Sequence, residues 1–169
     1  TAVPGYNTAM EVETLETRGL AYRPDLVVLG FCANDAGLPS FILAGQNAGL
    51  SGFAIWASDV GGYFSQPSEE VFARWIEFGA FSPLMQIHGM GCHEPWSYSA
   101  HLLEIYRRYA QVHTDLFPYI FTFARKASAT GLPIMRAMAF AYPDDPHIWD
   151  EMVEHQYGFG SELLVVPVY

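Results

Sequence analysis

The sequence predicts an α/β fold, because helical patterns alternate with short apolar runs that are typical of buried strands. The apolar runs are short and are bounded by turn residues, as expected for strands that are covered on both faces. Three pairs of helix and apolar run follow one another along the chain: residues 8–20 with 26–31, 40–47 with 53–56, and 67–78 with 83–88.

The first pair combines an amphipathic helix with a strand. Apolar residues recur among the carboxylates of residues 8–20, and Gly19 is a stop signal. Pro24 then separates this helix from the apolar run 26–31. The polar residues Asn34 and Asp35 follow that run, which favours a strand that ends at a polar edge.

Start signals precede the second and third helices. Ser40 can cap a helix that runs to about Asn47, ahead of the apolar run 53–56. Residues 67–70 combine a capping serine with two early carboxylates, and Trp75 belongs to the apolar stripe that continues this helix.

The last third of the chain predicts one long helix and one strand. The helix extends over residues 97–127, and Pro118 should kink or divide it, because proline lacks the backbone N–H that a helix interior uses. Residues 131–133 end it. The apolar run 162–169 predicts a strand that begins a C-terminal β domain.

The composition favours a globular protein and excludes several partner classes. Of 169 residues, 51% are hydrophobic, enough for a packed core. Eight basic residues against eighteen acidic ones give a net charge of −10, so we expect neither nucleic acid nor an anionic membrane as partner. Cys32 and Cys92 lack the spacing of a metal site, and no apolar run has the length of a membrane span. The compartment stays open.

Polar residues that directly follow apolar runs are the candidate site residues. Asn34 with Asp35, Asp59, and His88 hold such positions, where α/β folds open toward ligands. Two glycines and Tyr63 follow Asp59, which suits a sharp turn beside a ligand. Two interpretations stay open for each residue: Asp59 contacts a ligand or caps a turn, and His88 contacts a ligand or is a buried, hydrogen-bonded histidine.

A D-x-x-H spacing joins Asp144 to His147 and has the residue types of a catalytic dyad. The surrounding P-D-D-P sequence predicts a turn instead, because proline and aspartate are favoured turn residues.

From about residue 45 onward the sequence resembles the catalytic barrel of glycoside hydrolase family 31, the retaining α-glucosidases and α-xylosidases. The matching segments are residues 49–53, 56–63, 74–75, 79–83, 88–89, 95–96, 116–119, 131–136, 143–146 and 160–169. The resemblance implies the last strands and helices of a (β/α)8 TIM barrel. A helix-strand unit of doubly wound type precedes this partial barrel, and the first strand of a C-terminal β domain follows it.

The family resemblance also implies a site. The Asp of the D-[IV]-G-G-[FY] motif and the His that follows P-x-x-x-x-H contact sugar hydroxyls in that family, which assigns Asp59 and His88 to substrate binding. Tyr63 and Trp56 would line the site, and Gln86 stands where many members have Arg. The implied substrate is an α-linked oligosaccharide or α-glycoside, hydrolysed with retention and without a cofactor.

Residues 1–40 resemble a different family, the SGNH (GDSL-type) hydrolases, through residues 3–8 and 23–35. That resemblance makes Gly5 and Asn34 oxyanion-hole donors, with Cys32 replacing the usual glycine. A chimeric chain with a join near residues 37–45 is the resulting expectation. Its predicted parts are an SGNH-like segment, 1–40, a barrel segment, 41–160, and the start of a β domain, 161–169.

Retaining glycosidases need two carboxyl groups about 5 Å apart. In family 31 the nucleophilic Asp lies on an earlier strand, and the position of the acid/base Asp, counted back from Asp59, is occupied by Gly30. Only a shifted loop would let Asp35 or Asp25 replace it. The SGNH serine nucleophile is not found either. We therefore expect a glycosidase fragment that is inactive alone and needs the missing barrel half. An SGNH esterase fragment and a non-catalytic sugar-binding remnant are the alternatives.

Overall fold

The computed structural model describes residues 37–168 except 65, 151 and 152. The chain divides into two units, Thr1–Asp35 and Ala36–Tyr169, and all described elements belong to the second. The helix expected over 8–20, the strand expected over 26–31, and the candidate residues Gly5, Asn34 and Asp35 lie outside the described residues.

The second predicted helix is α2, Leu38–Leu50, which begins two residues before the expected Ser40. Gly37 is the N-cap, and Pro39 lies in the first turn, where its missing N–H costs no helical hydrogen bond. The apolar residues Leu38, Phe41 and Ile42 are buried, so α2 presents one face to the core.

The prediction of a buried strand over residues 53–56 is wrong. The structure has no strand there, and the side chains of Phe53 and Ile55 are 47% and 52% exposed. The alternate residues Ala54 and Trp56 are half-buried, and the backbone N–H of Ile134 donates to the Ala54 carbonyl at 3.2 Å. The apolar run is therefore covered on one face only, whereas the prediction assumed two covered faces.

Helix α3, Glu69–Ala80, confirms the third predicted helix. The Ser68 hydroxyl accepts a hydrogen bond from the Val71 N–H at 3.3 Å. Two glutamates occupy the first turn, where their negative charges interact favourably with the positive end of the helix dipole. The buried residues Phe72, Trp75 and Ile76 recur at helical spacing. Of the following apolar run 83–88, the only residue in a β-bridge is Gln86, which pairs with Asp59 in parallel.

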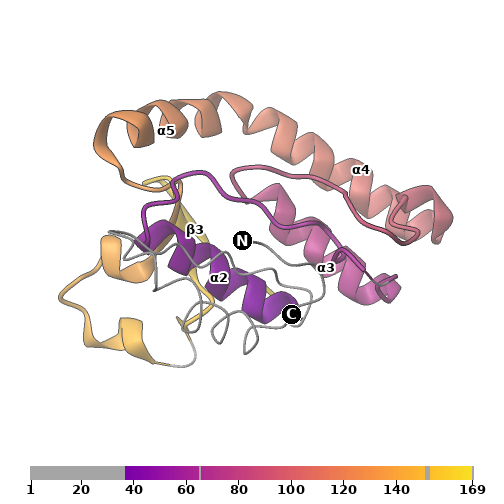
Figure 1. Ribbon diagram of the computed structural model, residues 1–169, viewed down its shortest axis with the longest axis horizontal. Coiled ribbons are helices and arrows are strands. Elements are labelled where there is room, and N and C mark those ends of the chain that lie inside the picture. The colour runs from indigo at the N-terminus through magenta and orange to yellow at the C-terminus, as the bar shows by residue number, and fades with distance from the viewer. Residues whose placement is uncertain (1–36, 65, 151–152, 169) are drawn as a thin grey trace, which may run out of the picture. The chain divides into compact units, whose positions relative to one another are not determined.

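The long aromatic helix is divided as Pro118 predicts. Helix α4, Ala100–Asp115, is followed by Leu116, which caps both helices, and α5, Phe117–Thr130, has Pro118 in its first turn. Gly131 ends α5 with a φ of +76°, a conformation that glycine adopts without strain. In Figure 1, α4 and α5 follow one another along one side of the described unit, and α3 packs against α4.

Three short strands, β1 (Met135–Ala137), β2 (Tyr157–Phe159) and β3 (Leu163–Val165), form an antiparallel sheet in the order β1-β2-β3. Gly158 pairs with Arg136 on one side and Leu164 on the other. Of the strand predicted over residues 162–169, only the three residues of β3 are in a strand.

Short 3-10 helices occupy Pro95–Ser97, Met138–Phe140 and Pro146–Trp149.

Tyrosine hydroxyls attach this sheet to the helices. The Tyr157 hydroxyl donates to the Phe81 carbonyl at 3.1 Å, and burial raises the pKa of Tyr157. The Tyr119 hydroxyl on α5 donates to the Phe159 carbonyl at 2.7 Å and accepts from the Glu162 N–H at 3.1 Å. Each of these bonds joins a side-chain hydroxyl to a backbone group of another element.

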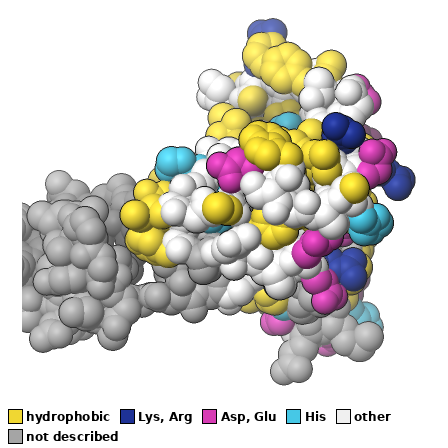
Figure 2. Space-filling model, turned by 90° about the vertical axis from the view of Figure 1, so that its right-hand side faces the viewer, with side chains coloured by type: hydrophobic (Ala, Val, Ile, Leu, Met, Phe, Trp, Pro, Cys, Tyr) yellow, Lys and Arg dark blue, Asp and Glu magenta, His cyan; other side chains and the backbone are white. Residues whose placement is uncertain are grey.

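The described surface carries large exposed apolar side chains, Met90, Trp96 and Trp149 among them. On the face drawn in Figure 2, apolar side chains are interspersed with acidic and basic ones. Within the described part of the chain, no helix combines the length and hydrophobicity needed to cross a membrane.

Gly160 should be essential for the attachment of the sheet to α5. Its φ is +66°, and a Cβ there would collide with the Tyr119 hydroxyl and would lie 2.7 Å from the Phe123 ring. We expect Gly160→Ala to lower the free energy of unfolding by about 2–4 kcal/mol, combining backbone strain with overpacking. Urea denaturation measures this change.

Gly131→Ala is the matched control for Gly160→Ala. Gly131 also has a positive φ, but a Cβ there would meet nothing within 4 Å. It should therefore cost only the backbone strain, about 1–2 kcal/mol. Equal losses for the two variants would contradict the packing argument.

Candidate functional site

Two loops bring the predicted sugar contacts together: the Asp59 loop, residues 59–63, and the His88 loop, residues 86–91. A parallel bridge between Asp59 and Gln86 joins them, and the Val60 N–H donates to the Gln86 carbonyl at 3.1 Å. The Gln86 side-chain amide also donates to Asp59 Oδ1 at 2.6 Å. The carboxylate is half-buried, and Gln86 is exposed.

Two glycines turn the Asp59 loop sharply. Gly61 and Gly62 have φ values of +94° and +84°, and the Gly62 N–H donates to the Asp59 carbonyl at 2.9 Å. This turn places Tyr63 beside His88, with ring centroids 5.2 Å apart and planes inclined at 55°. The Met90 N–H donates to the Tyr63 carbonyl at 2.7 Å, a second backbone link between the loops.

Helix α3 packs against the Asp59 loop and the residue before it. The indole N–H of Trp75 donates to the buried Ser58 hydroxyl at 2.9 Å, directly before Asp59. Val60 is fully buried, and a Cβ on Gly79 of α3 would lie 2.9 Å from its side chain. The half-buried Asp59 is therefore held between two core contacts.

The structure brings Asp59, Tyr63, Gln86 and His88 together on neighbouring loops. His88 is exposed, so the interpretation of it as a buried, hydrogen-bonded histidine is wrong. Asp59 enters a turn through its backbone carbonyl, which accepts from the Gly62 N–H, while its carboxylate accepts from the Gln86 side chain. That this carboxylate contacts a ligand remains a prediction.

Trp56, the fourth predicted sugar contact, packs against helices α2 and α3. Its ring lies 6.3 Å from the Phe78 ring of α3 at an angle of 59°, and a Cβ on Gly45 of α2 would lie 3.0 Å from it. Trp56 is half-buried between these helices. That it lines a sugar site remains a prediction.

The D-x-x-H segment forms a turn, as its sequence predicts. Asp145 caps the 3-10 turn Pro146–Trp149 by accepting from the His147 N–H at 2.9 Å. The His147 Nδ1 lies 3.0 Å from a carboxylate oxygen of Asp150, so its partner is not Asp144. All these residues are exposed, in contrast to the buried carboxylate of a catalytic triad.

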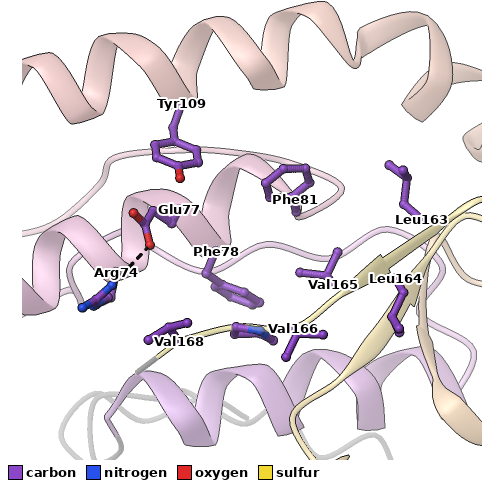
Figure 3. A pocket seen from close by; sticks show the side chains of 11 residues that line it. Arg74, Glu77, Phe78, Phe81, Tyr109, Leu163, Leu164, Val165, Val166 and Val168 are labelled. Atoms are coloured by element: carbon purple, nitrogen blue, oxygen red, sulfur yellow. Dashed lines mark ion pairs between the residues drawn. The ribbon is translucent and has the colours of Figure 1, made fainter.

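A cavity of about 350 Å³ lies elsewhere, between α3, α4 and the C-terminal segment (Figure 3). It is mostly apolar, with the Arg74 and Glu77 ion pair (3.8 Å) and the Tyr109 hydroxyl at one end. Burial, and then the negative charge of Glu77, raises the pKa of Tyr109. Asp59, Tyr63 and His88 do not line this cavity, so the candidate site is the surface formed by the two loops.

The described residues contain no group of three or more His, Cys, Asp or Glu side chains that could hold a metal ion. The candidate site therefore consists of one carboxylate, one amide, one imidazole and one phenol ring. These groups can donate and accept hydrogen bonds and can pack against a flat apolar surface.

The fold and the site define an α/β unit in which Asp59 and Gln86 pair in parallel, one before and one after helix α3, with polar side chains at that pairing. The model of the glycosyl hydrolase family 31 TIM-barrel domain matches residues 32–123, and that of the family 31 C-terminal domain matches residues 131–169. The chain belongs to glycosyl hydrolase family 31.

Relatives in this family carry different activities in their names. An α-xylosidase of Saccharolobus solfataricus is 34% identical over 139 residues, which are 79% of this chain and 19% of the xylosidase. Neutral α-glucosidase AB of Homo sapiens is 33% identical over 123 residues, covering 71% of this chain and 13% of that protein. The chain thus spans about one fifth or less of the length of these relatives.

A solved structure shares the same architecture. A family 31 dextranase of Flavobacterium johnsoniae, a mutant in complex with isomaltotriose, superposes with a TM-score of 0.70 at 36% identity. The match covers 77% of this chain and 17% of the dextranase. The described unit is therefore a fragment of the family 31 barrel with a small antiparallel sheet.

The comparisons bear differently on the predicted segments. They give no support to the SGNH resemblance of residues 1–40, and the barrel match begins inside that segment, at residue 32. The family C-terminal domain match starts at residue 131, upstream of the boundary predicted at 161. The bounds of the three predicted segments remain predictions.

We expect Asp150 to set the protonation of His147. The hydrogen bond to Asp150, and then the charges of Asp150 and Asp145, raise the pKa of His147. Any stabilisation from this pair is fully present below the unfolded-state pKa and is lost as pH rises through the folded-state pKa. The variant Asp150→Asn should lower the His147 pKa, as measured by NMR titration of its ring protons. An unchanged titration would show that the ion pair does not form in solution.

Proposed function

We propose that the Asp59 and His88 loops form part of the sugar-binding surface of a retaining α-glycoside hydrolase. The observation that carries this proposal is the placement of Asp59, Tyr63 and His88 on two bridged loops, with the rings of Tyr63 and His88 in contact. The Asp59 carboxylate accepts hydrogen bonds from sugar hydroxyls, and the exposed His88 ring donates or accepts one. The face of Tyr63 can pack against the apolar face of a sugar ring.

The substrate class is an α-linked oligosaccharide or α-glycoside. Support comes from the names of the relatives, an α-xylosidase and an α-glucosidase, and from the isomaltotriose bound to the similar dextranase.

Retention requires a nucleophile and an acid/base carboxyl about 5 Å apart. Asp59 is bonded to the neutral amide of Gln86, an arrangement for binding rather than for proton transfer between carboxyls. The resemblance to the family places the catalytic pair on segments that precede the Asp59 loop. We therefore propose that these 169 residues bind an α-glycoside but do not hydrolyse it.

We expect no turnover of an aryl α-glucoside or of an aryl acetate by the 169-residue chain. Colorimetric release of the aryl group measures both reactions, with the glucoside testing the glycosidase and the acetate testing the SGNH esterase. Glucoside hydrolysis that Asp59→Ala abolishes would overturn the proposed inactivity. Acetate hydrolysis that Asn34→Ala abolishes would favour an esterase.

Binding should depend on the two predicted contacts. We expect Asp59→Asn and His88→Ala each to weaken isomaltotriose affinity by roughly 10- to 100-fold, as expected when a hydrogen bond to a charged or strongly polar group is lost. Calorimetry or NMR titration of the 169-residue chain measures the affinity. Asp144→Asn, an exposed carboxylate in the P-D-D-P turn, is the matched control and should leave the affinity unchanged. Equal affinity for all four proteins would contradict a sugar site at these loops.

A further inference from the structure

His93 is a buried histidine behind the two loops of the candidate site. Its side chain belongs to a residue only 3% exposed, and neither ring nitrogen has a hydrogen-bond partner among the described residues. Its ring meets the Phe72 ring of α3 edge to face, with centroids 6.4 Å apart and planes at 89°. Burying two polar ring nitrogens without partners costs free energy, so an apolar residue would be the better choice for stability alone.

Glycines from both loops surround the His93 ring. A Cβ on Gly89, the residue after His88, would lie 2.7 Å from His93 Cε1 and 2.8 Å from the Tyr63 carbonyl oxygen. A Cβ on Gly61, two residues after Asp59, would lie 3.0 Å from His93 Cδ2. A Cβ on Gly91 would lie 3.1 Å from His93 Cε1. The ring therefore lies against the backbone of both loops, on sides where an added Cβ would press on it.

We propose that His93 is a positioning residue: its ring, wedged between the backbones of the Asp59 and His88 loops, sets the separation of Asp59, Tyr63 and His88. This inference rests on the proposed sugar site. The two loops are otherwise joined by the bridge between Asp59 and Gln86 and by the hydrogen bond from the Met90 N–H to the Tyr63 carbonyl. The glycines that lie against the His93 ring belong to these same two loops. Removing the ring leaves a space into which the glycine backbones can move.

Loop movement should be seen first in the contact between Tyr63 and His88. These rings are 5.2 Å apart, close enough for nuclear Overhauser effects between their protons. In the 169-residue chain, His93→Ala should remove these effects and weaken isomaltotriose affinity roughly tenfold or more, the loss expected when a strong hydrogen bond is misplaced. A residue that only stabilises the fold would lower the melting temperature and leave both readouts unchanged.

His155→Ala is the matched control, because His155 is a second buried histidine, 8% exposed, that leads into β2. Its removal should leave the Tyr63 and His88 effects and the isomaltotriose affinity as in the parent chain. The proposal is overturned if His93→Ala retains both readouts, or if His155→Ala changes them equally.

Gly91→Ala tests the same contact without deleting the ring, in case His93→Ala does not fold. Gly91 is exposed, and its added methyl group would press on His93 Cε1. We expect Gly91→Ala to weaken the Tyr63 and His88 effects, and His93→Asn, which is smaller, to relieve that change in the double variant. Additive changes in the double variant would contradict a shared contact. If the parent chain binds no isomaltotriose, the proposed sugar site fails, whereas the ring-to-ring effects still decide the role of His93.

Discussion

The parallel pairing of Asp59 with Gln86 is the constraint on which the candidate site depends. Parallel strands cannot be joined by a tight turn and need a crossover, and α3 is the crossover between these two positions. Its buried residues hold it against the loops it connects, through Trp75 to Ser58 and through Gly79 to Val60. The packing of α3 thus fixes where Asp59 and His88 emerge, and the two glycines after Asp59 bring Tyr63 back over His88.

The terminal sheet shares the core of this crossover. The Tyr157 ring of β2 meets the Phe78 ring of α3 edge to face at 6.1 Å, and its hydroxyl reaches the Phe81 carbonyl at the end of that helix. A buried aromatic residue with one polar atom can contribute apolar contact and also satisfy a backbone carbonyl. The sheet therefore packs against the same helix that carries the contacts to the Asp59 loop.

Local signals in the sequence predict the helices well. Ser68 and the following glutamates mark the start of α3, and Pro118 marks the division between α4 and α5, because each acts on its own backbone. The strands are predicted poorly: residues 53–56 have strand composition, yet strand formation depends on neighbours that the local sequence does not contain. Asp59 and His88 were identified by position after apolar runs and by family motifs, whereas their common location depends on the pairing at Gln86.

The role of His93 was missed because its signal is distributed. Three glycines at positions 61, 89 and 91 carry the information, and they meet one ring only in the folded chain. The cavity beside Tyr109 could not be predicted for the same reason, because its walls come from α3, α4 and the C-terminal segment. In both places the residues are distant in the sequence and become neighbours only in the folded chain.

The amide at Gln86 gives the candidate site its electrostatic character. An arginine, which the resemblance places at this position in many family members, would bond Asp59 as a charged fork and neutralise its charge. Gln86 bonds Oδ1 through a neutral amide, which adds no positive charge beside the carboxylate and leaves further lone pairs for hydroxyl donors. Hydroxyl groups bind more strongly to a charged acceptor than to a neutral one. With a neutral amide at this position, the geometry of the Asp59 carboxylate depends on the backbone bridge to Gln86 and on the contact of Trp75 with Ser58.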